Sequence, residues 1–343
     1  MTGRSLSTRA WTLPEAIVLL VVVAVLVGFL CLAGADNRRR SRVAGGLDNL
    51  HFFGSGTESY AADHHDQFWA FTWRRYIVYA PGFPAVPDDI SAVANQAVEI
   101  MRRRGPTPQA SMIPGWVPLV SYSHLVLLDH LGTTLNIPQV ASPEDGMLRS
   151  WQRTNSENEW FTLPHRPTGN FAGFRWRFYS SYEIGTAFSY RDAATFINGA
   201  LAPTISQGST VGQFIVPSAA APAGPPPRRR DEVRFPSDKA HVWDRYQRHF
   251  GPQVLHFGYA EARLPILMVD GSASIRSNTS ANQGFSPANP NSPNATVAAY
   301  QPDTWWEPPT RNGTSSETVT LRLRYTRWGL RGRDFNGPEV SGP

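Results

Sequence analysis

The sequence predicts an α+β protein in which one long N-terminal helix precedes a loop-rich globular head with a small antiparallel sheet. Residues 16–35 form an uninterrupted run of uncharged, mostly apolar side chains. The 343-residue chain contains 28 glycines and 29 prolines, which indicates many turns and long loops. From Trp160 onward, apolar and polar residues alternate in short stretches, as expected for short strands.

The composition excludes several classes of protein. The apolar content of 41% is too high for a wholly disordered chain, and a mean hydropathy of −0.31 excludes a polytopic membrane protein. The single cysteine, Cys31, excludes a disulfide scaffold and a cysteine-based zinc site. The net charge is +5, but the arginines are spread along the chain and Lys239 is the only lysine. We therefore expect no nucleic-acid partner.

The apolar run 16–35 is long enough to predict a transmembrane helix. Twenty helical residues at about 1.5 Å each span about 30 Å, the thickness of the hydrocarbon layer. Arg4 and Arg9 precede the run without any acidic residue, which favours a cytoplasmic leader. Basic residues also follow the run, at 38–40 and 42, so arginine counting alone does not fix the orientation. The sequence predicts a single-pass protein of the cytoplasmic (inner) membrane with its head outside the cytoplasm.

Three interpretations of this N-terminus compete. The first is a signal peptide removed after Ala33-Gly34-Ala35, and the second is a plain signal anchor. The third rests on the sequence RAWTLPE at 9–15, because a carboxylate at the edge of an apolar helix is costly unless it is paired. Cleavage after Ala10 would create an α-amine on Trp11. In a bundle of such helices, that amine could neutralise Glu15 of a neighbour.

This arrangement resembles the prepilin cleavage and methylation motif of type IV pilins and type II secretion pseudopilins. The resemblance implies that a prepilin peptidase cuts between Ala10 and Trp11, that Trp11 is N-methylated, and that Glu15 is the assembly glutamate. Ala10 stands where glycine is usual, and Trp11 where phenylalanine is usual. Pro14 is also unusual, although proline is tolerated in the first turn of a helix.

The resemblance implies a pilin-like fold and a structural role rather than an enzymatic one. The expected function is a subunit of a type II secretion pseudopilus or a type IV pilus-like filament. Its expected partners are prepilin peptidase, other pilin-like subunits and the membrane. Looser resemblances to pseudopilin-like proteins occur at 49–68, where the long helix would end, at the hairpin 265–272, and in the tail 324–332.

The predicted organisation is a leader over 1–10, a helix over 11–66, and an extracytoplasmic head over 67–343. The Pro-rich stretch 202–231 is predicted to be an exposed insertion, with its arginines at 228–230 open to proteases. In the second half of the long helix, one face is predicted to be apolar because its residues recur at helical spacing. These residues are Leu47, Leu50, Phe53, Tyr60 and Ala61.

Four further elements are predicted in the head. Residues 88–104 form an amphipathic helix capped by Asp88 or Asp89. Alternation of aromatic and basic residues predicts a strand over 171–182. Leu264–Val269 and 272–276 form a hairpin around a tight Asp-Gly turn, and 318–325 forms a final strand.

Residues with catalytic or metal-binding chemistry are few. Asp63, His64, His65 and Asp66 offer potential metal ligands, but a polar helix end that enters a turn is the preferred interpretation. No cofactor is predicted, and a metal at these four residues is left open. His241, His249 and His256 with Asp244 have the chemistry for acid–base catalysis, yet no nucleophile, phosphate-loop or zinc motif accompanies them.

An alternative function remains open beside the structural one. In this alternative, a single-span or secreted cell-envelope protein uses its head to bind a ligand or to hydrolyse an envelope substrate. The chain has 11 tryptophans, which could line a glycan or peptide surface, although packing in the core is the preferred interpretation. Trp69, Trp73, Trp305 and Trp306 are among them.

Overall fold

The computed structural model divides the chain into two compact units, Met1–Ala44 and Gly45–Pro343. The second unit is the head. Side chains are not described at 29–36, 157, 171–174, 196–197 and 200–201. The structure describes residues 12–105, 112–113, 115–154, 156–167, 171–189, 196–197, 200–201, 205–215, 228–287, 289, 293–303 and 305–339.

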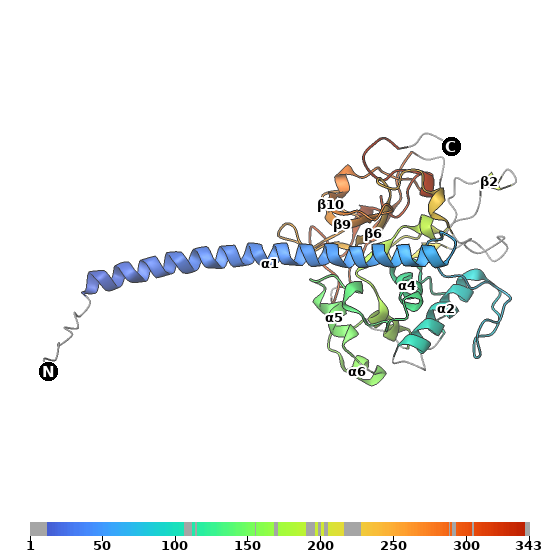
Figure 1. Ribbon diagram of the computed structural model, residues 1–343, viewed down its shortest axis with the longest axis horizontal. Helices are drawn as coiled ribbons and strands as arrows, with labels where there is room; N and C mark the ends of the chain where they lie inside the picture. Colours follow the sequence, from blue (N-terminus) through green and yellow to red (C-terminus); the bar gives the residue numbers. More distant parts are fainter. Residues whose placement is uncertain are drawn as a thin grey trace. The chain divides into compact units, whose positions relative to one another are not determined.

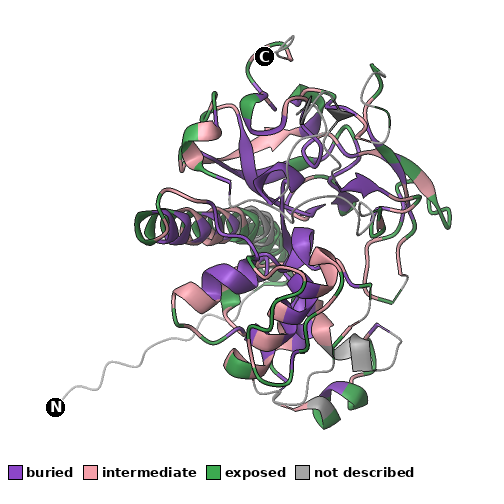
Figure 2. Cartoon of the chain, turned by 90° about the vertical axis from the view of Figure 1, so that its right-hand side faces the viewer, coloured by how far each residue is buried: buried purple, intermediate pink, exposed green. Residues whose placement is uncertain are grey.

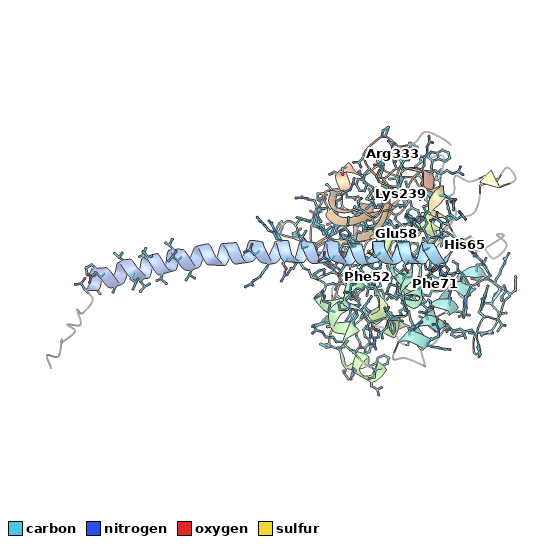
Figure 3. The ribbon with its side chains drawn as sticks, viewed as in Figure 1. Phe52, Glu58, His65, Phe71, Lys239 and Arg333 are labelled. Carbon is cyan, nitrogen blue, oxygen red and sulfur yellow. The ribbon has the colours of Figure 1, made fainter. Side chains whose placement is uncertain are left out.

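Helix α1, Leu13–Asp63, occurs where the sequence predicts a helix over 11–66. It begins in the first unit and ends in the second, so the compact head starts at Gly45 rather than at residue 67. The described large apolar side chains between Leu13 and Val27 are exposed, and Figure 3 shows side chains projecting both above and below this part of the helix.

The predicted membrane span over 16–35 is wrong. Among the helical residues that the structure describes, none form a segment that is both long and apolar enough to cross a membrane. The described apolar stretch from Leu13 to Gly28 is about 24 Å long at 1.5 Å per residue, short of the roughly 30 Å required. The predicted single-pass location in the cytoplasmic membrane, which depended on this span, is corrected with it.

The second half of α1 is part of the core of the head. Its buried face follows the helical spacing that the sequence predicts, and Leu50, Phe53 and Tyr60 are at most 4% exposed. Gly54 and Gly56 weaken a helix intrinsically, but here they allow close packing. A Cβ atom at Gly54 would lie 3.3 Å from Leu267 Cδ1, and one at Gly56 would lie 3.1 Å from Leu127 Cδ2.

In the part of the chain that the structure describes, five shorter α-helices accompany α1. The sequence prediction of a capped helix over 88–104 is confirmed by α2, because the Asp88 carboxylate accepts a hydrogen bond from the Ser91 N–H at 2.8 Å. Within the head, the helices α2, α4 and α5 lie on one side of α1 and the main sheet lies on the other (Figure 1). The helices are α2 Asp89–Arg104, α3 Leu119–Tyr122, α4 His124–His130, α5 Gly146–Gln152 and α6 Glu157–Thr162.

The main sheet has four antiparallel strands in the order β1-β6-β9-β10. These are β1 Tyr182–Ile184, β6 Ala240–Asp244, β9 Arg263–Met268 and β10 Ala273–Ser277. The hairpin predicted from the sequence is the β9–β10 pair, and Gly271 supplies the positive φ of +85° at its turn. In β1, β6 and β9 nearly all residues are buried, whereas those of β10 are of intermediate exposure; Figure 2 colours the chain by burial. The α+β class with small antiparallel sheets is confirmed.

The remaining strands form two-stranded antiparallel pairs. They are β2 Phe196–Ile197 with β3 Ala200–Leu201, β4 Ser206–Gln207 with β5 Phe214–Ile215, β7 Tyr246–Gln247 with β8 Leu255–His256, and β11 Val297–Tyr300 with β12 Glu317–Thr320. Short 3₁₀ helices occupy Pro138–Val140, Phe171–Phe178, Thr186–Phe188, Arg230–Glu232, Asn278–Ser280 and Gly329–Arg331.

Two predicted strands differ from the structure. The stretch 171–182 is a 3₁₀ helix over Phe171–Phe178, and only its end enters β1. A half-buried strand needs one solvent-facing side, but every residue from 177 to 189 is buried, so the alternation carries no strand signal there. The strand predicted over 318–325 is shorter, because β12 ends at Thr320.

The structure describes only the two ends of the predicted exposed insertion over 202–231, and parts of these ends are packed. Residues 205–215 carry the β4–β5 hairpin. Arg228 is 7% exposed, and its carbonyl oxygen accepts a hydrogen bond from the Phe68 N–H at 2.8 Å. Arg230 forms an ion pair with Glu58 of α1. Residues 228–230 therefore pack against the end of α1, while 202–204 and 216–227 lie outside the described residues.

Candidate functional site

The predicted assembly residue, Glu15, lies in the first turn of α1. Its Oε2 atom accepts hydrogen bonds from the backbone N–H and from the hydroxyl of Thr12, both at 2.8 Å. These two bonds lower the pKa of Glu15, the backbone bond having the larger effect. Thr12 is not among the functional residues predicted from the sequence, although the Thr-x-x-Glu spacing is the signature of a helix-capping box.

The predicted processing residues, Ala10 and Trp11, lie outside the described residues. Immediately after Glu15, the helix presents consecutive exposed apolar side chains. Ile17, Leu20 and Val25, for example, are 55%, 71% and 52% exposed. Because the exposed residues are consecutive, they cover the whole circumference of the helix rather than one stripe.

The four potential metal ligands at 63–66 form the end of α1 and a turn. His64 stacks on Tyr60 at 3.9 Å between ring centroids, and Asp63 lies 3.7 Å from His130. His65 and Asp66 both adopt positive φ, which reverses the chain after the helix. Throughout the described part of the chain, no group of three or more His, Cys, Asp or Glu residues is placed to hold a metal ion.

The histidines noted in the sequence have separate surroundings. His241 lies among aromatic rings and is 4.6 Å from Phe188 between ring centroids. His256 stacks on Tyr300 at 4.7 Å, and His249 Nδ1 lies 3.2 Å from Glu144 Oε2. Burial lowers the pKa of His241 to about 3, so its ring is neutral near pH 7.

Because buried histidines stay neutral in the folded state, we expect the free energy of unfolding to decrease in acid. Burial also lowers the pKa of His124 to about 3, whereas an unfolded histidine titrates near 6.5. Below about pH 6.5 the unfolded state therefore binds protons that the folded state excludes. The free energy of unfolding should fall as pH decreases toward 3, by up to about 1.4 kcal/mol per pH unit for each such histidine. In urea titrations from pH 7 to 4, His241→Phe should reduce this slope, while His51→Phe, at an exposed position, should not. An unchanged slope in His241→Phe would contradict the assignment.

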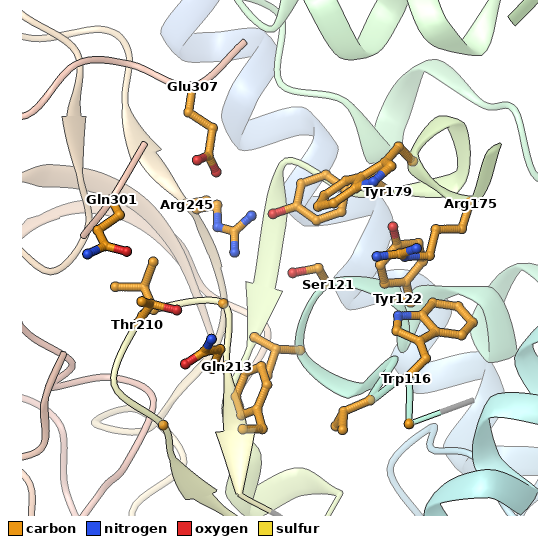
Figure 4. Close-up of a pocket in the computed structure, with 18 of the residues that line it drawn as sticks. Trp116, Ser121, Tyr122, Arg175, Tyr179, Thr210, Gln213, Arg245, Gln301 and Glu307 are labelled. Atoms are coloured by element: carbon orange, nitrogen blue, oxygen red, sulfur yellow. The ribbon is translucent and has the colours of Figure 1, made fainter. Parts of the chain in front are cut away.

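A cavity of about 900 Å³ lies in the head between the α3 segment and the β4–β5 hairpin (Figure 4). Its volume is in the range typical of small-molecule sites. We name it the aromatic cavity, after the rings along one wall. Five separate parts of the chain supply its lining: residues 113–122, 175–179, 208–215, 245 and 301–307.

The aromatic wall is a continuous series of rings. Trp116 contacts Tyr122 at 4.8 Å between centroids, and Tyr122 contacts Tyr179 at 5.6 Å. Tyr179 lies 5.3 Å from Trp176, which in turn lies 5.0 Å from Trp306. Trp176 and Trp306 are only partly buried, so their rings present apolar surface to the cavity.

Polar groups point into the same space. Arg245 is 7% exposed, and its guanidinium extends toward the hydroxyl of Tyr179 (Figure 4). The Tyr179 hydroxyl is buried and has no hydrogen-bond partner among the residues described. On the hairpin side, Thr210 and Gln213 contribute a hydroxyl and a carboxamide.

Arg245 shares its carboxylate partner with a second arginine. Its Nε atom lies 2.8 Å from Oε1 of Glu183, while Nη2 of Arg324 donates to both oxygens of Glu183 at 2.9 and 2.8 Å. All three side chains are at most 9% exposed. The carboxylate of Glu307, which also lines the cavity, accepts hydrogen bonds from the Tyr246 hydroxyl at 3.0 Å and from a backbone N–H at 2.9 Å.

The aromatic cavity is not predicted from the sequence. Its residues come from distant segments, and no short motif links them. The one available signal was the tryptophan content, which was assigned to core packing. That interpretation holds for Trp69, which is 2% exposed, but Trp306 lines the cavity and Trp305 is 63% exposed.

The chain matches no family model, no curated protein and no solved structure. The pilin resemblance at residues 9–15 therefore stays a prediction. The classification as a transmembrane pseudopilin of a secretion system is not retained, because its membrane span is not found in the described residues.

Proposed function

We propose that the chain is a structural subunit of a pilus-like filament, assembled through the N-terminal part of α1. The observation that carries this proposal is the exposed apolar surface from Leu13 to Val27. Proteins that stay monomeric rarely expose continuous apolar surface of this extent. Burying a Val, Leu or Ile side chain contributes about 1.5–3 kcal/mol, so a bundle of such helices gains stability from many side chains at once.

The position of Glu15 supports helices of pilin-like subunits as the occupants of this surface. It is the only charged residue between Thr12 and Gly28. A carboxylate enclosed by apolar neighbours requires a cation. Cleavage between Ala10 and Trp11 by a prepilin peptidase would create one, the α-amine of Trp11, close to the level of Glu15 in a neighbouring helix.

The mass of the mature N-terminus tests this proposal. The chain should be co-expressed with a prepilin peptidase, and the product analysed by intact mass and terminal sequencing. We expect a chain that begins at N-methylated Trp11 and sediments as oligomers. The matched control is Ala10→Glu, which should block cleavage and leave the chain unassembled. A mature chain that begins at Asp36 would overturn the proposal, because it would lack the apolar stretch.

A further inference from the structure

The aromatic cavity combines flat apolar faces with an excess of positive charge. Trp176 and Trp306 supply partly buried rings on one wall. Ser121, Gln213 and Gln301 add hydroxyl and carboxamide groups that both donate and accept hydrogen bonds. A ligand with a ring that has many hydroxyl groups and apolar C–H faces suits this cavity. Its hydroxyl groups can bond the polar side chains, and its C–H faces can pack on the indoles.

The charges favour an anionic ligand. Arg175, Arg245 and Glu307 line the cavity, and Arg324 and Glu183 lie behind Arg245, so three guanidiniums stand against two carboxylates. Glu183 is shared between Arg245 and Arg324, and Glu307 is already held by protein donors. The terminal nitrogens of Arg245 make no hydrogen bond to the described residues, and the guanidinium points into the cavity (Figure 4). A planar guanidinium in this position is suited to a carboxylate or sulfate group.

We propose that the aromatic cavity binds an acidic saccharide. The sugar ring packs on Trp176 and Trp306, and its carboxylate or sulfate group binds the Arg245 guanidinium. The Tyr179 hydroxyl, buried without a partner among the described residues, donates to the same anionic group. A peptide is the less suitable ligand, because the faces of two half-buried indoles, tilted by 59° to each other, match a sugar ring better than an extended backbone. This site lies wholly in the head and does not depend on filament assembly.

Titration calorimetry of the purified full-length chain in a zwitterionic detergent tests the proposal. The probes are trigalacturonic acid, a sulfated galactose trisaccharide and neutral galactotriose. We expect at least one acidic trisaccharide to bind about tenfold more tightly than the neutral one, since a charge-assisted bidentate contact is lost in the neutral ligand. The better acidic probe identifies whether a carboxylate or a sulfate is preferred. Equal affinity for all three probes, no binding of any, or equally tight binding of an acetylated Asp-containing tripeptide overturns the proposal.

Variants distinguish binding of the acidic probe at this site from its nonspecific attraction to a basic protein. Arg245→Gln should remove the preference for the acidic probe, and Trp306→Ala should weaken binding of the acidic probe about tenfold or more. Trp305→Ala is the matched control, because Trp305 is 63% exposed and does not line the cavity. Since Arg245 also pairs with Glu183, Gln301→Ala at an exposed position gives a second test if Arg245→Gln unfolds. Unchanged acid binding in both Trp306→Ala and Gln301→Ala contradicts the assignment.

Discussion

Replacing Glu15 by glutamine is expected to abolish assembly while leaving α1 intact. A glutamine side-chain oxygen can still accept the Thr12 N–H bond, so the cap of the helix is preserved. Only the charge is lost. In an assembled bundle this change would leave the Trp11 amine of a neighbour buried without its partner, at a cost of about 3–5 kcal/mol. Association should then weaken by at least about 100-fold.

Two further variants distinguish the effect of the Glu15 charge on assembly from the effect of helix capping. Glu15→Asp, one methylene shorter, should assemble with intermediate efficiency, and Thr12→Ala should assemble normally because it keeps the carboxylate. Crosslinking and sedimentation of the processed chains measure the outcome, with circular dichroism as the check on helix content. Normal assembly of Glu15→Gln would show that Glu15 only caps the helix and complements its dipole. The filament proposal would then lose its electrostatic support.

Glu183→Gln is expected to destabilise the head by about 3–5 kcal/mol. Glu183 is the common partner of Arg245 and Arg324, and the side chains of both Glu183 and Arg324 are fully buried. Without the carboxylate, two buried guanidiniums would face each other without a counterion. Arg324 also donates through Nη1 to the carbonyl oxygen of Val211 at 2.7 Å, so the change should loosen the β4–β5 hairpin too.

The matched control is Glu261→Gln. Glu261 pairs with Arg311 at 2.8 Å, but both side chains are more than 40% exposed. Exposed pairs of this kind contribute about 0–1 kcal/mol. Urea unfolding at pH 7 followed by tryptophan fluorescence compares the two variants. Equal losses in Glu183→Gln and Glu261→Gln would mean that the desolvation of the buried network cancels its ion pairing.

Features encoded by local sequence were predictable. The buried face of α1 follows from helical spacing, the α2 cap from an aspartate before an apolar-periodic stretch, and the β9–β10 turn from its Asp-Gly pair. Each of these signals acts over a few residues, so tertiary context does not override it. The start of α1 also fits this rule, because its cap depends only on Thr12 and Glu15, which lie three residues apart in the sequence.

Features that depend on contacts between distant segments were not predictable. The stretch 171–178 alternates like a strand but forms a 3₁₀ helix, and it leads into residues 177–189, which are all buried and so have no solvent-facing side. The packing of Arg228 against Phe68 joins residues far apart in the sequence. The aromatic cavity, in the same way, exists only because five segments converge.

The burial of the second half of α1 in the head has a mechanical consequence. A pull on α1 at Gly45, where the head begins, would act on a helix whose Leu50, Phe53 and Tyr60 are buried in the core. The hydrogen bond from Trp69 Nε1 to Thr57, at 2.8 Å, ties the last turns to the following segment. An axial pull therefore acts in shear on all these contacts together, rather than peeling them apart one at a time. The head can bear tension without an added clamp, because its anchor is its own core helix.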